Sequence, residues 1–419
     1  MTEYKLFTKF GQRSRSRKPS VTVTEYSNPT LKSGKKSKPN YLFKLKIKQS
    51  FIFFNLLIMK KNLLYMLIAA AMISGCTKND VVDSEINKDS NLIGFSTYKN
   101  ISRGNPVDNN EEFLTANNTF GVTAFIKQEE TLQESPYMGT TTEGVVIISD
   151  GSKWNYKQAS DQAYWPTKGE ILDFYAYTPL DNSIITNPTF NATKGLTLTY
   201  TVPNNETAQK DLMYAVALNQ QKPENSNSVT MPFKHALTQV HFKIGTSAEN
   251  LYVDVAENGI RIYNLKSTGT LTTKTGLETE VWNNLSGQAQ YSVISQVVSE
   301  AGYEMTDDGT QKFTSIGSAD QALMLLPQKI EAWSESNTTG AYLTISCKIY
   351  QKLANETKIY LHGSADTYAE VKVGISNNWV RNQKITYNLN IGATAGVLTP
   401  IEFVTEVETW SPIDKEIVK

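Results

Sequence analysis

Apolar and polar side chains alternate along several stretches of this chain. The clearest are Phe120, Val122, Ala124 and Ile126; Leu196, Leu198, Tyr200 and Val202; Leu343, Ile345, Cys347 and Ile349; and Ile385, Tyr387, Leu389 and Ile391. Successive side chains of a strand point to opposite faces of its sheet, so each stretch predicts a strand with one buried face.

The alternation changes phase between residues 229 and 244. Val229, Met231, Phe233 and Leu237 stand at odd positions, and Val240, Phe242 and Ile244 stand at even positions. Because a shift of one residue turns an apolar face to solvent, the change predicts a bulge or a break near Thr238-Gln239. No stretch after residue 76 sustains helical spacing. Short strands separated by turn clusters therefore predict an all-β fold of sandwiches rather than parallel α/β units.

One polar stretch predicts a domain boundary. Residues 221–228 contain a proline, are rich in Asn and Ser, and show no periodicity, which is typical of a linker. We therefore expect an N-terminal β-sandwich over residues 92–220 and a C-terminal β-sandwich over residues 229–419. Each is long enough for about seven strands and a core of its own.

Charge divides the chain into two unlike parts. Residues 1–75 carry 15 basic and 2 acidic side chains, and the remaining residues carry 26 basic and 39 acidic ones. The acidic part has no electrostatic attraction for the phosphates that dominate nucleic-acid affinity, so no nucleic-acid partner is expected. Cys76 and Cys347 are the only cysteines, so neither a disulfide framework nor a cysteine zinc site is expected.

The basic part contains an export signal. From Met59, two lysines precede an apolar run from Leu63 to Ile73, which is too short to span a bilayer. This layout predicts a lipoprotein signal peptide over residues 59–75. Residues 1–58 are basic and aperiodic and stand in front of the signal. We interpret them as an upstream extension from a misassigned start, with Met59 as the true initiator.

The signal ends in Ile73-Ser74-Gly75-Cys76, which resembles the bacterial lipobox. In such proteins the peptide is cut before the cysteine and the cysteine receives lipid, so Cys76 is the expected lipid attachment site. Several acyl chains would hold the protein on the outer membrane without a spanning helix. Residues 76–91 would form a tether. Its acidic side chains either mark the protein for the outer surface or only keep the tether solvated.

Residues that could carry catalysis or bind metal are few. His235 and His241 would lie about 20 Å apart on a strand, too far to share a metal, so they are interpreted as structural. Asp307-Asp308-Gly309 predicts a turn before it predicts a calcium loop. Cys347 lies on the apolar face of its strand and is expected to be unreactive. No nucleophile elbow is present, so neither an enzyme nor a cofactor is expected.

Aromatic residues form the remaining candidate site. Trp154, Tyr156, Tyr164 and Trp165 cluster just ahead of residues 172–179. Exposed tryptophan and tyrosine rings stack on sugars, so one interpretation is a platform for glycan. The other interpretation is that these rings plug the end of the first sandwich.

Several motifs together are similar to those of a known family. They are Trp154 to Trp165-Pro166, residues 172–179, residues 211–215, residues 229–240, Trp379 to Tyr387, and Leu398 to Trp410. With the lipobox they resemble the fimbrillin (Mfa-like) family, lipoproteins of gut and oral anaerobes that build or decorate surface fimbriae. The resemblance covers most of residues 76–419. It implies two transthyretin-like β-sandwich domains in tandem and other fimbrial subunits as partners.

The resemblance also implies a route of assembly. In fimbrillins an extracellular protease, often arginine-specific, removes an N-terminal segment that includes the first strand. The open sheet that remains is filled by a strand from the next subunit. Residues 91–101 would be that first strand, with Ile93 and Phe95 on one face. Arg103 and Gly104 form the candidate processing site, although Arg103 is equally consistent with an ordinary surface loop.

The donor strand would lie within residues 398–410. There Ile401, Phe403 and Val407 alternate along an extended segment. If this segment completes its own domain instead, the protein is an anchor, a tip or a relative that does not polymerise.

Two functions remain in view. The first is a structural or adhesive subunit of surface fimbriae on the outer membrane, assembled by strand donation, with a host or glycan ligand if it is adhesive. The second is a surface glycan-binding lipoprotein, in which the rings near Trp154 and Trp165 contact sugar.

Overall fold

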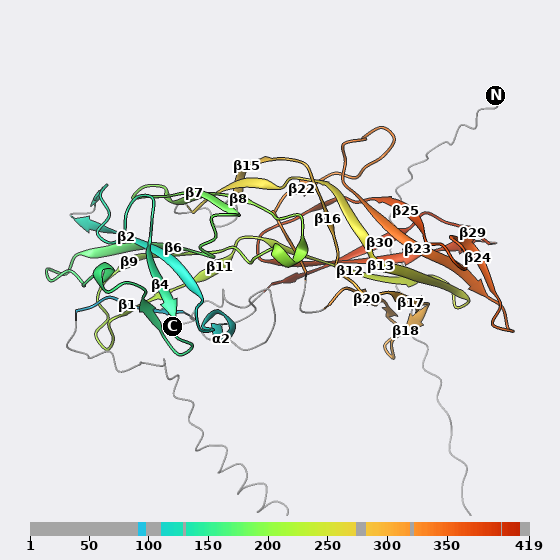
Figure 1. Cartoon of the computed structure of the whole chain (residues 1–419), viewed down its shortest axis with the longest axis horizontal. Coiled ribbons are helices and arrows are strands. Elements are labelled where there is room, and N and C mark those ends of the chain that lie inside the picture. The colour runs from blue at the N-terminus through green and yellow to red at the C-terminus, as the bar shows by residue number, and fades with distance from the viewer. Residues whose placement is uncertain are drawn as a thin grey trace, which may run out of the picture. The chain divides into compact units, whose positions relative to one another are not determined.

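The computed structural model describes residues 91–97, 110–128, 131–273, 282–318, 322–394 and 396–410, all within one compact unit. This part of the chain is built almost entirely of strands (Figure 1). Its helical segments are single turns: α2 (Asn110–Phe113), η1 (Ala159–Asp161) and η2 (Glu206–Ala208). None of the helices found in these ranges is long and apolar enough to cross a membrane. The all-β prediction is confirmed.

Two sheets form the first part of the fold. The larger has the order β11 (Phe233–His235), β9 (Met213–Gln220), β6 (Ile171–Thr178), β2 (Thr119–Gln128), β4 (Val145–Ser149) and β5 (Trp154–Tyr156), with β3 (Thr131–Leu132) paired to β2. The smaller has the order β15 (Trp282–Ser286), β14 (Thr268–Thr272), β8 (Gly195–Thr201) and β7 (Ile185–Asn191). The smaller sheet packs on one face of the larger one, where Tyr177 of β6 meets Phe190 of β7.

A short parallel pair covers the other face of the larger sheet. It consists of β1 (Gly94–Thr97) and β10 (Ser228–Met231). Their apolar side chains join Phe120, Phe174 and Phe233 in a core cluster of their own. The larger sheet therefore has a buried layer on both faces, which explains why seven consecutive residues of β6, Leu172–Thr178, are buried.

Two more sheets form the second part of the fold. One has the order β20 (Thr314–Ile316), β12 (Thr238–Thr246), β27 (Gln383–Ile391) and β30 (Glu402–Thr409), with β21 (Leu323–Leu325) paired to β12. The other has the order β16 (Ala289–Ser292), β13 (Leu251–Leu265), β23 (Tyr342–Lys352) and β24 (Lys358–His362), with β17 (Val298–Ala301) on β13 and β25 (Ala369–Gly374) on β23. Their inward side chains belong to one core cluster.

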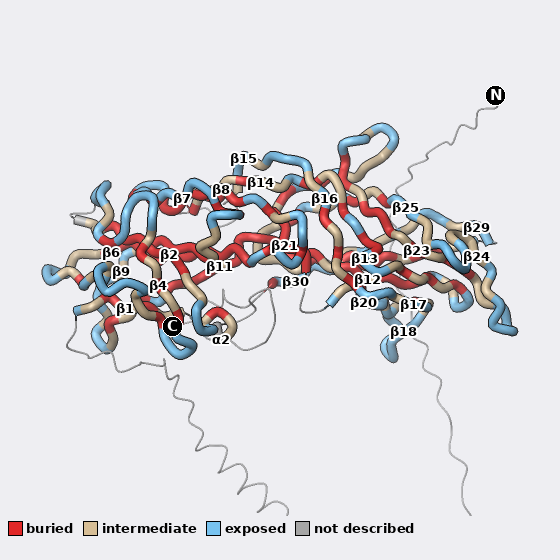
Figure 2. The backbone as a smooth tube through the Cα atoms, viewed as in Figure 1, coloured by how far each residue is buried: buried red, intermediate tan, exposed pale blue. Residues whose placement is uncertain are grey.

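Three short hairpins or bridges complete the described strands. They are β18 (Glu304–Met305) with β19 (Gln311–Lys312), β22 (Lys329–Ile330) with β26 (Asn377–Asn378), and β28 (Ala393–Thr394) with β29 (Val397–Leu398). Figure 2 shows the contrast between the buried central strands and exposed elements such as β15 and β18.

The alternating patterns of the sequence are found in the structure. Each of the four stretches forms one strand, β2, β8, β23 or β27, with its apolar members turned to a core. The change of phase is a break: Ala236 and Leu237 separate β11 from β12, and the chain passes there from the first pair of sheets to the second.

The strands do not divide at the predicted linker. Beyond residues 221–228, β10 pairs with β1 and β11 pairs with β9. Later still, β14 pairs with β8 through residues 268–272. The prediction that everything from residue 229 onward belongs to a C-terminal sandwich is therefore corrected: β10, β11, β14 and β15 complete the sheets of the first one. Strand pairing overrides the local polarity that marked the loop before β10.

Candidate functional site: the first and last strands

The first described strand is deeply buried. Ile93 and Phe95 are 0% and 6% exposed, on the same face as the sequence predicted. The ring of Phe95 packs edge-on against three aromatic rings, with centroid distances of 5.8 Å to Phe120, 5.9 Å to Tyr156 and 6.3 Å to Phe174. Burying side chains of this size stabilises a fold by roughly 1.5–3 kcal/mol each. The two side chains of this short strand therefore contribute strongly to the core.

Hydrogen bonds hold this strand along both edges. On one edge β1 runs parallel to β10, from Gly94 opposite Ser228 to Thr97 opposite Met231. On the other edge, the Ile93 N–H donates to the Ala163 carbonyl at 2.9 Å, and the Trp165 N–H donates to the Asn91 carbonyl at 2.7 Å. Residues 91–93 are therefore paired with one backbone segment and residues 94–97 with another.

The predicted aromatic cluster binds this strand rather than a ligand. The Trp154 indole N–H donates to Thr97 Oγ1 at 3.2 Å, and the Tyr156 hydroxyl donates to the Ile93 carbonyl at 2.8 Å. The Trp165 indole N–H donates to the Asn227 carbonyl, at 2.8 Å, just before β10. Burial raises the pKa of Tyr156, so its hydroxyl stays a donor at any ordinary pH. These residues clamp β1 and its partner from the side.

Of the two interpretations of the aromatic cluster, the burial of the two tryptophans supports rings that plug the first sandwich rather than a glycan platform. Trp154 and Trp165 are 7% and 2% exposed, and their rings pack against Phe113 and Phe174. Tyr156 is half-buried against Phe95. Of the four clustered aromatics, only Tyr164 is exposed.

The last described strand is held much less firmly. β30 runs antiparallel to β27, from Glu402 opposite Asn390 to Thr409 opposite Gln383, and it pairs with no other strand among those described. Ile401 and Phe403 are half-buried, and Phe403 packs against Tyr387 with a centroid distance of 5.5 Å. Val407 lies on the same face of the strand but is 52% exposed, so the cover of this face does not extend to its far end.

A buried tryptophan follows β30 directly. Trp410 is 3% exposed and stacks on the ring of His235, with 4.3 Å between centroids and an angle of 3° between the planes. His235 Nδ1 lies 2.8 Å from Asp211 Oδ2, and both side chains are buried. The Trp410 N–H also donates to the Asn382 carbonyl at 2.9 Å. We call Trp410, His235 and Asp211 the C-terminal latch, because their buried contacts hold the end of β30 in place.

Comparisons with known proteins identify the family to which this fold belongs. The family described as fimbrillin-like matches residues 105–410. The chain belongs to this family. A fimbrial protein from Bacteroides vulgatus shares its fold, with 19% identity, a TM-score of 0.52, and coverage of 76% of this chain and 99% of that one. No curated protein matches the sequence.

A more distant structural match is the tip fimbrial protein Mfa3 from Porphyromonas gingivalis. It has 12% identity and a TM-score of 0.33, and the match covers 72% of this chain and 96% of that one. A likeness at this level carries no further argument. Family membership identifies this chain as a fimbrillin-like protein, within a family of fimbrial proteins rather than of enzymes.

The other residues considered from the sequence are structural in this fimbrillin-like fold. Cys347 is buried, which raises the pKa of its thiol to about 12. His241 lies on β12, where burial and then the charges of Lys384 and Lys243 lower its pKa to about 4. Asp308 accepts hydrogen bonds from Thr306 and Thr310 in a tight turn. No group of residues arranged to hold a metal ion occurs in the ranges that the structure describes.

Some predicted site residues lie outside the described residues. These are Cys76, Arg103 and Gly104. Lipid attachment and processing therefore stay predictions.

Sequence reasoning missed two parts of the site. The partner of β1 is β10, which is more than 130 residues away in the chain, and no local pattern announces such a pair. The latch was also missed, although His235 and Trp410 both stand in stretches that resemble the family. The available signal in the sequence was the position of two aromatic residues, His235 and Trp410, near the ends of predicted strands.

Proposed function

We propose that this protein is a structural or adhesive subunit of surface fimbriae, assembled by β-strand donation after loss of its N-terminal strand. One observation carries the proposal: residues 91–97 form a short segment that is paired with two other backbone segments in turn and buried on one face. A segment of this kind can be removed by one cut and replaced by another strand without rearrangement of the sheets around it.

Removal of β1 would leave a slot lined by unpaired backbone groups and uncovered apolar side chains. The edge of β10 and the carbonyl of Ala163 would lose their partners in β1 and the residues just before it, and unpaired buried backbone groups are costly. The rings of Phe120 and Phe174 would lose the covering side chain of Phe95. A new strand that supplies backbone pairing and two apolar side chains at alternate positions would restore both.

The C-terminal segment matches this demand. Ile401 and Phe403 repeat the Ile-x-Phe order of Ile93 and Phe95. In the free subunit the later pair is only half-buried, so transfer into the slot of a neighbour would bury both side chains more fully. We propose that Ile401 takes the place of Ile93, that Phe403 takes the place of Phe95, and that the donor runs parallel to β10.

Export and processing complete the proposal. Cys76 would carry lipid and hold the newly exported subunit on the outer membrane, without any need for a cofactor. A cut between Arg103 and Gly104 would separate the body from both β1 and the lipid in one step. The mature subunit could then leave the membrane and join the fimbrium, with other fimbrial subunits as its partners.

The first test is the N-terminus and intact mass of the protein recovered from its native cell envelope. We expect an acylated Cys76 on the newly exported form and an N-terminus at Gly104 on the assembled form. Acylated Cys76 as the sole form would contradict the loss of β1 and favour an anchor that keeps its first strand.

The second test is assembly of the purified protein. Treatment with an arginine-specific protease should produce ladders that resist denaturant, and Arg103→Ala should prevent them. The double variant Ile401→Ala/Phe403→Ala should be cleaved but should not form ladders. The matched control is Val404→Ala, which alters an exposed side chain on the opposite face of the same strand. Equal ladders from the double variant and the control would contradict the proposed donor.

A further inference from the structure

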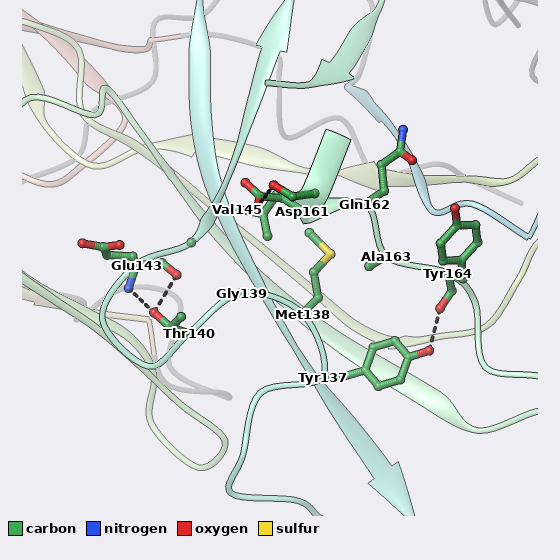
Figure 3. A pocket seen from close by; sticks show the side chains of 12 residues that line it. Tyr137, Met138, Gly139, Thr140, Glu143, Val145, Asp161, Gln162, Ala163 and Tyr164 are labelled. Carbon is green, nitrogen blue, oxygen red and sulfur yellow. Dashed lines mark hydrogen bonds between the residues drawn. The ribbon is translucent and has the colours of Figure 1, made fainter. Parts of the chain in front are cut away.

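Two exposed tyrosines line one groove on the first pair of sheets. Among the aromatic residues that the structure describes, only Tyr137 and Tyr164 are exposed, by 37% and 54%. Both lie in a groove of about 600 Å³ between the turn that precedes β4 and the segment that follows η1 (Figure 3). The other large aromatic side chains of the described ranges are buried or half-buried, so this pairing is a distinctive feature of the surface.

The wall that carries Tyr137 is rigid. The Tyr137 N–H donates to the Ala124 carbonyl at 2.8 Å, and the Ala124 N–H donates to the Met138 carbonyl at 3.0 Å. Met138 is buried, and Gly139 turns the chain with φ +78°. A Cβ at Gly139 would lie 2.8 Å from Thr123 Oγ1, so a side chain is disfavoured there as well. These contacts fix the wall to β2.

The wall that carries Tyr164 is held by β1. Backbone bonds from Ile93 and Asn91 fix Ala163 and Trp165 on either side of it, and Leu92 forms a bridge with Tyr164 itself. The Tyr137 hydroxyl then donates to the Tyr164 carbonyl at 2.6 Å and joins the two walls. Figure 3 shows this bond, with the ring of Tyr164 directed away from it. The groove is therefore formed before any ligand arrives, which lowers the entropic cost of binding.

The chemistry of the lining is selective. Beside the ring faces, the groove presents the carboxylate of Asp161, the amide of Gln162 and the hydroxyl of Ser160, and its lining contains no Lys, Arg or His. Apolar ring faces suit the C–H faces of a sugar, and planar polar groups suit its hydroxyls. A carboxylate without a cation disfavours a negatively charged ligand.

We propose that this groove binds a neutral oligosaccharide, with the ring of Tyr164 stacked on a sugar face and Asp161 and Gln162 bonded to hydroxyl groups. The side chains that assembly would exchange, Ile93, Phe95, Ile401 and Phe403, do not line the groove. Assembly would replace only the backbone of residues 91–93 beside Tyr164, where the donor strand would take over its pairing. The site goes beyond assembly by giving the class of molecule that the surface of a subunit would hold.

The test is binding of the purified full-length protein to an array of neutral, sialylated and sulfated glycans. We expect binding to neutral glycans such as oligomannose or galactose-terminated chains, and none to their sialylated or sulfated forms. Titration with the best soluble neutral oligosaccharide should then show at least a ~10-fold loss of affinity in Tyr164→Ala. Tyr164→Phe is the matched control and should keep most of the affinity, because it retains the ring.

Several outcomes would overturn the inference. They are no binding to any neutral glycan on the array, a preference for anionic glycans, or unchanged affinity in Tyr164→Ala. Binding of an unstructured peptide in the same groove instead of sugar would also overturn it. Melting temperature and ladder formation should be the same in Tyr164→Ala and the wild type. Ladders without glycan binding would therefore reject this site while leaving the fimbrial proposal intact.

Discussion

The first and last described strands carry the same apolar pair in very different surroundings. Ile93 and Phe95 of the first are buried, with backbone partners on both edges, whereas Ile401 and Phe403 of the last are half-buried at a sheet edge. The comparison shows that an Ile-x-Phe sequence does not determine its own burial; the slot that receives it does. Transfer of the half-buried Ile401 and Phe403 into a buried slot would favour assembly by roughly 2–3 kcal/mol through apolar burial alone.

The two strands are also retained by different means. β1 is clamped by side chains of other segments, namely Trp154 and Tyr156, and could be lost only if the chain were cut. β30 rests on β27 and on the latch at its end, so its exchange would need no cut, only the release of Trp410. In the proposed assembly, the strand with more buried contacts is the one that proteolysis would remove, and the edge strand is the one that would move to a neighbour.

Phe95→Ala should have the largest effect on this contrast. It removes a buried ring that touches three others, so the uncut protein should lose about 3–5 kcal/mol of unfolding free energy. The matched change Phe403→Ala removes a half-buried ring that packs on Tyr387 and should cost less than half as much. Urea unfolding followed by circular dichroism measures both. Equal losses of unfolding free energy in the two variants would show that Phe95 and Phe403 are equally well packed.

Trp410→Ala should release the last strand and leave the first one in place. Loss of the buried ring and of its stacking on His235 should cost about 2–4 kcal/mol, mostly as local opening. Hydrogen exchange read by mass spectrometry should speed up in residues 402–409 and stay unchanged in residues 93–97. Val404→Ala is the control, since it alters an exposed side chain of the same strand. Unchanged exchange in residues 402–409 would show that pairing with β27 is sufficient to hold the strand.

Acid should weaken the sheet that holds β30 more than the slot that holds β1. His241 has a folded pKa of about 4 against 6.5 in an unfolded chain, so protonation favours the unfolded state. Its contribution is fully present above pH 6.5 and is lost as pH falls toward 4, by about 2 kcal/mol at pH 5. Lys243 and Lys384 oppose the added charge, and Glu406 of β30 pairs with Lys243 at 3.5 Å. No residue of β1 is titratable.

Measurement of this effect needs a variant without the ionisable ring. His241→Gln should flatten the dependence of unfolding free energy on pH between 7 and 5 relative to the wild type. Exchange in residues 402–409 should rise on acidification in the wild type and rise less in the variant. If the wild type and His241→Gln show the same dependence of unfolding free energy on pH, protonation of His241 does not destabilise this sheet.

The strands themselves could be predicted from the sequence, because alternation is a local property. The stretches around Phe120, Leu198, Ile345 and Leu389 are all strands with the predicted buried face. The burial of Ile93 and Phe95 on one face was predictable in the same way. The fimbrillin-like family could also be identified, because its motifs are spread along the whole chain.

Strand partners could not be predicted, because they depend on contacts between distant segments. Thr268–Thr272 reads as an ordinary strand of the second half, but it pairs with β8 of the first. Trp154 and Trp165 are rings near a turn, and only the position of β1 beside them explains their burial. Tyr164 is the exposed ring of this cluster, and only its position at the groove distinguishes it from the buried Trp154 and Trp165. Site prediction failed where it needed these long-range contacts.

The smallest predicted effect separates the clamp on β1 from the neighbouring groove. Tyr156→Phe removes the hydroxyl that donates to the buried Ile93 carbonyl, so unfolding free energy should fall by about 1–2 kcal/mol. Tyr137→Phe removes a similar bond to the Tyr164 carbonyl in an exposed groove, where water can replace it, and should cost less than about 0.5 kcal/mol. A larger loss in Tyr137→Phe would mean that the groove, rather than the clamp, secures the first strand. In that case the groove would both bind the ligand and hold β1 in place.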